Sequence, residues 1–208
     1  MAAGAATGGT ALVRDRLNAQ RHVDLGRAVL AAMPVNIGAA DAAVVSSIAV
    51  SAQSKVRAGQ ELARVRTAVA ATPGRSAVQV LRAPSDATVV SVLGSVGTTL
   101  RAGDPLLTLY DPKKLTFHVD VPVDKLRGLR IGMTVSVRGA GTNRTLVTTL
   151  DSVLPLVGTA TAASPGDLTI VLRPRDPSRV TTLVPGLPFA ATADIDTAAH
   201  GTPVLDSA

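Results

Sequence analysis

The spacing of apolar residues along the chain changes at Pro34. Before it, apolar side chains recur every three or four positions: Leu17, Leu25, Ala28, Val29, Ala32 and Met33. This spacing predicts an amphipathic helix within residues 12–33, ended by Pro34. The apolar face of such a helix serves either packing within the chain or docking on a membrane surface or partner. Residues 1–10 hold almost only Ala, Gly and Thr, so residues 1–34 are predicted to be a flexible leader and a helix.

After Pro34 the period becomes two, which is typical of β-strands. Short Val-rich runs are separated by Gly, Pro, Ser and Asp at intervals of about 8 to 12 residues, as in β sandwiches and barrels. The predicted fold class is therefore mainly β.

An internal repeat of about 44 residues marks the first β region. Residues 44–50, followed by Val56 and the turn Arg57-Ala58-Gly59, are echoed by residues 89–93, followed by Leu100 and the turn Arg101-Ala102-Gly103. Each half predicts a strand, an apolar residue directed into the core, and a tight turn in which glycine adopts a positive φ. Neither half can bury its apolar face alone. Residues 35–111 are thus predicted to form a sandwich of two pseudo-symmetric halves, with an exposed tip at Pro73-Gly74-Arg75-Ser76.

Residues 112–197 predict a second β module. Apolar and polar residues alternate from Leu115 to Val121, and residues 123–129 form a charged connection that takes one helical turn. The later runs are residues 131–137, 146–154, 168–172 and 189–195. Five or six strands of this length form a small closed barrel or sandwich. Residues 198–208 are predicted to be a frayed tail.

Composition narrows the possible functions. Hydrophobic residues make up 46% of the chain, which is enough to bury cores, but two Phe, one Tyr and no Trp provide no stacking platform for bases or sugars. The net charge of +6 comes from scattered Lys and Arg residues, so no nucleic-acid partner is predicted. Scattered surface arginines and an anionic partner such as a lipid surface both fit this charge. Charged residues interrupt the first 35 positions, so neither a signal peptide nor a membrane anchor is predicted.

No residue pattern predicts catalysis. The histidines His22, His118 and His200 lie in three separate segments without metal-site spacing, and His118 is expected to face solvent on a strand. Asp194 and Asp196 share one strand face, but a glycosidase would also need a sugar platform. We therefore predict a protein that is not an enzyme and has no catalytic residues, metal or cofactor.

Several motifs together resemble one known family. They are the two Arg-Ala-Gly turns, the stretch Arg82-Ala83-Pro84 that opens the second half, and the barrel sequences Ile131-Gly132-Met133 and Leu183-Val184-Pro185-Gly186. Their order over residues 35–197 resembles the membrane fusion proteins, which are the periplasmic adaptor subunits of export pumps. The resemblance implies a lipoyl-like domain followed by a β-barrel. The α-helical hairpin that many members insert between the lipoyl halves is missing, as is the membrane anchor.

The hairpin between the halves also bears on a carrier function. Lipoyl and biotinyl carrier domains display a modified Lys at this hairpin, whereas the tip here holds Arg75 and no Lys. A swinging-arm carrier is therefore not predicted.

The resemblance implies an adaptor that forms a homo-oligomeric ring and links an inner-membrane transporter to its export path. Its place would be the extracytoplasmic face of the cell envelope, with the membrane contacted indirectly or through residues 12–33. The oligomer interface is expected near the repeated turns, at Arg57, Gln60, Arg101 and Asp104, although exposed turn residues without a partner fit equally well. The alternative is a structural scaffold with this fold that assembles into filaments in the cytoplasm through exposed barrel edges.

Overall fold

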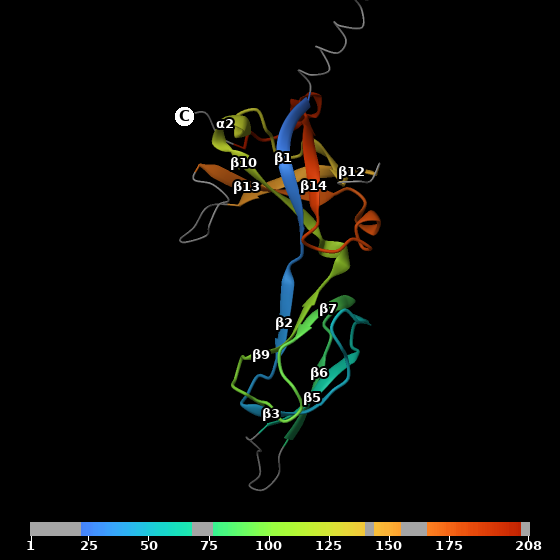
Figure 1. The fold of residues 1–208 in the computed structure, drawn as a ribbon. Coiled ribbons are helices and arrows are strands. Elements are labelled where there is room, and N and C mark those ends of the chain that lie inside the picture. Colours follow the sequence, from blue (N-terminus) through green and yellow to red (C-terminus); the bar gives the residue numbers. More distant parts are fainter. Residues whose placement is uncertain (1–21, 68–76, 140–143, 155–165, 205–208) are drawn as a thin grey trace, which may run out of the picture. The chain divides into compact units, whose positions relative to one another are not determined.

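The computed structural model describes residues 22–67, 77–139, 144–154 and 166–204 (Figure 1). The chain divides into two compact units. One unit is Ala32–Lys114, and the other combines the residues up to Ala31 with those from Leu115 onward. The second unit is thus built from two segments that lie far apart in the sequence. Among the described residues, no helix has the length and the apolar character needed to cross a membrane.

The Ala32–Lys114 unit consists of two four-stranded antiparallel sheets that share one apolar core. Its strands are β2 (Pro34–Gly38), β3 (Ala43–Ile48), β4 (Lys55–Val56), β5 (Glu61–Thr67), β6 (Ala77–Arg82), β7 (Ala87–Val92), β8 (Thr99–Leu100) and β9 (Pro105–Tyr110). The strand orders are β2-β9-β7-β4 and β6-β5-β3-β8. The predicted tip at residues 73–76 lies outside the described residues, but the flanking strands β5 and β6 pair with each other, beginning at Thr67 and Ala77.

Each half of this unit gives one short strand to the other half. In the first half, β4 pairs with β7 of the second, with Val56 opposite Ala87. In the second half, β8 pairs with β3 of the first, with Leu100 opposite Ala43. These two pairs coincide when the sequence is shifted by 44 positions. The halves are therefore related by a quasi-twofold axis, and the predicted pseudo-symmetric sandwich is confirmed.

Backbone hydrogen bonds between the halves follow the same relation. The amide of Gly59 donates to the carbonyl of Ala83 at 2.8 Å. Its mate, meaning the residue 44 positions away in the other half, is Gly103, whose amide donates to the carbonyl of Ala39 at 3.1 Å. Both alanines are buried, because each lies beneath the turn of the other half. The core between the sheets is made of Val, Leu and Ala, including the fully buried mates Leu62 and Leu106. Neither half is a folding unit by itself, since each supplies a strand and turn contacts to the other.

The second unit is a closed six-stranded barrel with the order β1-β10-β13-β12-β11-β14. Its strands are β1 (His22–Ala31), β10 (Thr116–Pro122), β11 (Thr134–Gly139), β12 (Thr145–Leu154), β13 (Asp167–Pro174) and β14 (Pro188–Asp194). The predicted β-barrel after the lipoyl-like domain is confirmed, and so is the helical turn, α2 (Val123–Leu126). The core includes Phe117 and Phe189, whose rings meet edge to face with centroids 5.0 Å apart.

The predicted amphipathic helix is wrong for residues 22–31, which form β1. A β-bulge explains the error: the pairing of β1 with β14 shifts between Asp24 and Gly26, and Gly26 has a φ of 89°. The bulge puts Leu25 and Ala28, three positions apart, on the same inner face of the strand. This spacing imitates that of a helix. Because the apolar face of β1 lines the barrel core, these residues are not a membrane-docking surface; residues 12–21 lie outside the described part of the chain.

The predicted frayed tail is also wrong for residues 198–204. The 3-10 helix η3 (Ile195–His200) follows β14, and the chain then returns to the barrel. The amide of Ile131 donates to the carbonyl of Thr202 at 2.9 Å, and the amide of Val204 donates to Leu129 at 3.1 Å. These bonds hold the segment in place because they occupy backbone groups that a frayed end leaves to water. The other short helices are η1 (Pro112–Lys114) and η2 (Pro177–Arg179).

Candidate assembly interface

The four residues expected at an interface form two turns of nearly identical structure. In the first, the amide of Arg57 donates to Gln60 Oε1 at 2.9 Å, and the amide of Gln60 donates back to the carbonyl of Arg57 at 3.0 Å. In the second, the amide of Arg101 donates to Asp104 Oδ2 at 2.9 Å, and Asp104 donates back at 3.1 Å. Gln60 and Asp104 thus shape the turns, and the exposed Arg57 and Arg101 side chains extend from them.

Glycine is required in both turns. Gly59 and Gly103 have φ values of 77° and 84°, in the left-handed region that L side chains disfavour. Directly before the turns, Val56 and Leu100 are buried in the core, as the sequence predicted. A buried apolar residue and a left-handed glycine therefore fix the place of each exposed arginine.

Among the described residues, side-chain hydrogen bonds to the other half are found at the first turn and not at the second. Asp86 accepts a hydrogen bond from the amide of Ala58 at 3.1 Å, and Arg82 Nη1 donates to the carbonyl of Gly59 at 2.9 Å. At the corresponding positions, 44 residues earlier, the chain has Ala42 and Gly38, which cannot make side-chain hydrogen bonds to the second turn. The two turns therefore share a backbone geometry but differ in their polar surroundings.

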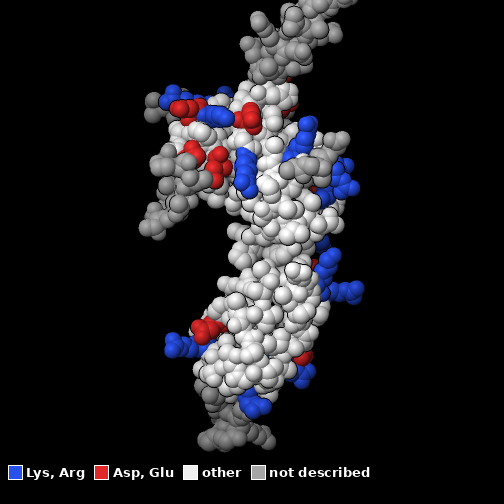
Figure 2. All heavy atoms as spheres, viewed as in Figure 1, with Lys and Arg blue, Asp and Glu red and all other residues white. Residues whose placement is uncertain are grey.

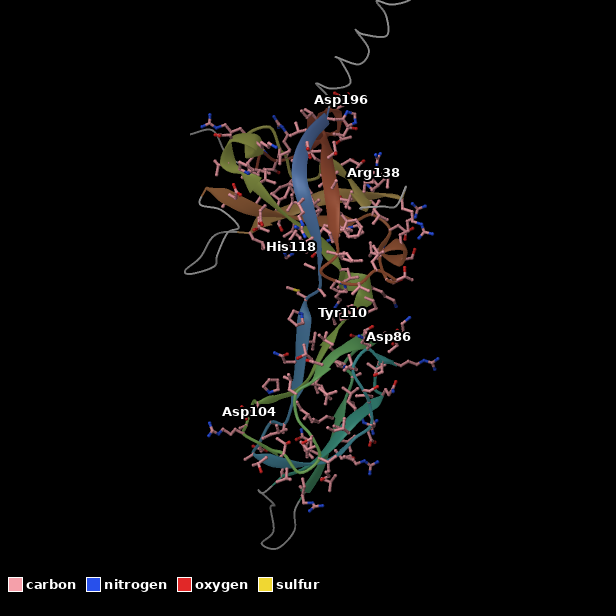
Figure 3. All side chains as sticks on the ribbon, in the orientation of Figure 1. Asp86, Asp104, Tyr110, His118, Arg138 and Asp196 are labelled. Atoms are coloured by element: carbon pink, nitrogen blue, oxygen red, sulfur yellow. The ribbon has the colours of Figure 1, made fainter. Side chains whose placement is uncertain are left out.

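The structure does not bring the four residues together. Figure 3 shows Asp86, which contacts the first turn, and Asp104, which belongs to the second, on opposite sides of the Ala32–Lys114 unit. The quasi-twofold axis has this effect, because it carries each turn to the opposite side of the sandwich. The chain thus offers two separate turn surfaces, with Arg57 in the first turn and Arg101 in the second.

An ion pair lies beside the first turn. Arg64 Nε is 2.7 Å from Glu61 Oε1, and Arg64 Nη2 donates to Glu61 Oε2 at 3.1 Å. This hydrogen bond lowers the pKa of Glu61, and the same contact raises the pKa of Arg64. Both groups are in contact with solvent, so water screens the attraction and the pair adds little to stability.

His118 departs from the expected exposure. It lies on β10 and is half-buried, with Nε2 at 3.4 Å from Thr116 Oγ1. Burial lowers its pKa, against the weaker opposing effect of Asp120. Within the described ranges, no three His, Asp or Glu side chains are close enough to hold a metal ion together.

A hollow on the outer wall of the barrel was not predicted. It has a volume of about 490 Å³ and is lined by Asp24, Gly26, Arg27, Arg138, Gly139, Pro188, Phe189 and Ala190. Arg27 on β1 and Arg138 on β11 are both register partners of Ala190 on β14, so two guanidinium-bearing residues flank one alanine. No sequence pattern indicates that these two arginines are neighbours, because the spacing of apolar residues before Pro34 predicts a helix and not a strand.

Comparison with known proteins places the fold. No family model and no curated protein matches the sequence. Among solved structures, ZneB from Cupriavidus metallidurans is similar with a TM-score of 0.63 and 13% identity, over 83% of this chain and 98% of ZneB. The membrane fusion protein Spr0693 from Streptococcus pneumoniae R6 is similar with a TM-score of 0.52 and 13% identity, over 83% of this chain and 97% of Spr0693. The chain has the fold of a membrane fusion protein.

A third structure extends the comparison. A putative efflux transporter from Bacteroides eggerthii is similar with a TM-score of 0.57 and 15% identity, over 90% of this chain and 72% of that one. The resemblance to membrane fusion proteins that the turn motifs suggested is thereby confirmed at the level of fold. At such low identity, the comparison carries over the architecture and leaves the roles of individual side chains to this chain's own geometry.

Proposed function

We propose that this chain is a non-catalytic adaptor that oligomerises and links a membrane transporter to its export path. The observation that carries the proposal is the shared fold: the similarity to ZneB covers 83% of this chain, which is more than either of its two units alone. Spr0693, described as a membrane fusion protein, has the same fold. We place the adaptor at the extracytoplasmic face of the cell envelope.

The separation of the two turns supports a ring. A head-to-tail ring needs two different surfaces on each subunit, one for each neighbour. The turn at Arg57 and Gln60 and the turn at Arg101 and Asp104 lie on opposite sides of their unit, which fits this requirement. In the proposed assembly, the arginine side chains make the contacts, and Gln60 and Asp104 hold the turns in shape.

Charge reversal at the turns tests the assembly. We expect closed rings in negative-stain micrographs of the purified protein at low salt, and their loss in the variants Arg57→Glu and Arg101→Glu. Arg127→Glu is the matched control, since it makes the same charge change at an exposed barrel residue. Protein that stays monomeric at high concentration and low salt would contradict the ring. Rings that survive both reversals would contradict the interface residues.

The link to a transporter needs its own experiment. We expect a membrane permease to be encoded beside this chain and to co-purify with it after co-expression in detergent. Failure of the two to co-purify, with both proteins folded, would refute the link and leave the fold assignment intact.

The scaffold alternative has less support. It relied on exposed barrel edges that pair with other copies, but the barrel is closed and each of its six strands pairs on both sides. Open filaments in the micrographs described above would favour it over the ring.

A further inference from the structure

The loop that follows β7 exposes two bulky apolar side chains. Leu93 is 58% exposed and Val96 is 63% exposed. Their mates, 44 positions earlier, are Ala49 and Ala52. The two loops share their backbone anchor, since the amide of Leu93 donates to Leu106 and that of Ala49 donates to Leu62, both at 2.8 Å. The fold of the loop therefore does not require bulky apolar residues at positions 93 and 96.

The surface extends toward β7 in the same asymmetric way. Val90, in the bulge of β7, is 49% exposed, whereas its mate in the first half is Ser46. At three mated positions, the second half thus has a larger apolar side chain than the first. The first half thus serves as a reference for the second, because the same backbone structure carries small side chains in one half and larger apolar ones in the other at these positions.

The loop lies at the end of the unit that is opposite to the chain connections. β7 begins beside Tyr110, the last residue of β9, with Thr88 as its partner. The first residue of β2, Pro34, is also paired with Tyr110. Leu93 follows the other end of β7, about 17–20 Å away for a strand of this length. The bulky pair therefore stands at the end from which the chain does not leave the unit.

The loop itself carries no charged residue. Residues 87–100 contain no Asp, Glu, Lys or Arg. Figure 2 shows few charged side chains on the visible face of the unit that carries β2 to β9, most of them along its margins. Charged residues border this stretch: Asp86 precedes it, Arg101 follows it, and Asp104 directly precedes β9. Across β3, Arg64 pairs with Glu61, and Arg66 stands opposite Val44.

The lack of charge on the loop favours a second copy of this chain as the occupant. The chain has a net charge of +6, so two copies repel each other wherever cations would meet. At the loop, two copies can approach without burying an unpaired charge, and polar residues at the rim of an interface are normal. An apolar surface that matches itself also suits a twofold contact, in which the same patch is used by both copies.

We propose that residues 90–96 dock against the same residues of a second copy of this chain, around a twofold axis. Leu93 and Val96 form the centre of the contact and Val90 its edge. Three side chains on each copy fall short of the roughly 800 Å² per partner of a stable complex, so the contact alone forms a weak dimer. The next step rests on the proposed function. A ring would present many such loops at once, and the contact would then join two rings.

Sedimentation velocity at about 1 M salt tests the contact, because this concentration screens charge-mediated association. We expect the wild-type chain to form a concentration-dependent dimer. In Leu93→Ser/Val96→Ser, the dissociation constant should rise on the order of 100-fold, because two buried apolar side chains are lost from each copy. The matched control Ala49→Ser/Ala52→Ser changes the mated loop and should dimerise like wild type. Both pairs are exposed, so circular dichroism should show all the proteins folded.

A wild-type chain that remains monomeric at millimolar concentration in high salt would overturn the proposal, as would a Leu93→Ser/Val96→Ser variant that dimerises like wild type. The proposed ring and the proposed loop contact can be refuted independently of each other. A dimer at high salt without rings at low salt refutes the ring and supports the docking of the loop. Rings at low salt whose subunits do not dimerise at high salt do the reverse.

Discussion

Replacing Gly103 by alanine separates backbone strain from steric overlap. A Cβ atom added at Gly103 meets no atom within 4 Å, so the substitution creates no clash. The φ of 84° remains unfavourable for any residue with a Cβ atom. The left-handed conformation costs an L residue about 1–2 kcal/mol, and the smaller unfolded-state entropy of alanine offsets about 0.4–1 kcal/mol of this cost. We expect Gly103→Ala to lower the free energy of unfolding of the unit by about 1 kcal/mol.

The quasi-twofold mate gives an internal replicate. Gly59 has a φ of 77° and equally open space around the added Cβ atom, so Gly59→Ala should cost the same about 1 kcal/mol. The two turns lie on opposite sides of the unit, so the double variant should lose about 2 kcal/mol. Gly103→Asn is the control, because asparagine tolerates the left-handed region, and it should recover at least half of the lost stability.

The chain contains its own probe for this measurement. Tyr110 is its single tyrosine and lies on β9 of the same unit, and the chain has no tryptophan. Tyrosine fluorescence during urea unfolding thus reports on the Ala32–Lys114 unit. A loss of about 1 kcal/mol shifts the melting temperature of a unit of this size by about 4–8 °C. Equal stability of Gly103→Ala and wild type, or equal losses in the alanine and asparagine variants, would refute the role assigned to φ.

Three further predictions concern the shared core, the β-bulge and the pH dependence. Leu62 and Leu106 are fully buried, so Leu62→Ala and Leu106→Ala should each lower the free energy of unfolding by about 2.7–5 kcal/mol, measured by urea unfolding followed by tyrosine fluorescence. A loss below about 1 kcal/mol in either variant would contradict the shared core. Gly26 lies in the bulge with a φ of 89°, so Gly26→Ala should destabilise the barrel by about 1 kcal/mol. Circular dichroism should show this loss as a lower melting temperature, and an unchanged melting temperature would argue against the bulge. Burial lowers the pKa of His118 in the folded state, so on acidification the unfolded chain takes up this proton before the folded chain does. The free energy of unfolding therefore falls as the pH drops below about 6.5. His118→Gln should reduce this loss, and a pH profile of stability that the substitution leaves unchanged would contradict the burial of His118.

The repeat explains why much of the first unit could be predicted from sequence. The turns Arg57-Ala58-Gly59 and Arg101-Ala102-Gly103 depend on neighbouring residues, since the apolar residue before each turn and the glycine within it are fixed by local conformation. Two equal local patterns, neither able to bury its apolar face, then favour the pairing of the halves. The strand alternation from Leu115 to Val121 is equally local, and its apolar residues are buried in the barrel core as predicted.

The errors arose where position in the sheet overrides spacing in the sequence. The bulge at Gly26 shifted the inward residues of β1 by one position, and only its pairing with β10 and β14 reveals the strand. Residues 198–204 carry no strong pattern, yet Thr202 is held by a backbone bond from Ile131, a residue far away in sequence. Such bonds depend on partners that no local window contains.

The sequence by itself determined the mainly β class, the two pseudo-symmetric halves and the conformation of the two turns, because each depends on residues that are close neighbours or repeat in order. Only the tertiary structure decided that the first barrel strand comes from the N-terminal segment and that the two turns face opposite sides of their unit. It also decided that Leu93 and Val96 stay exposed where their mates are alanines. Closure of a sheet and the direction of a symmetry axis are properties of the assembled strands, since they follow from pairings between residues that are distant along the chain.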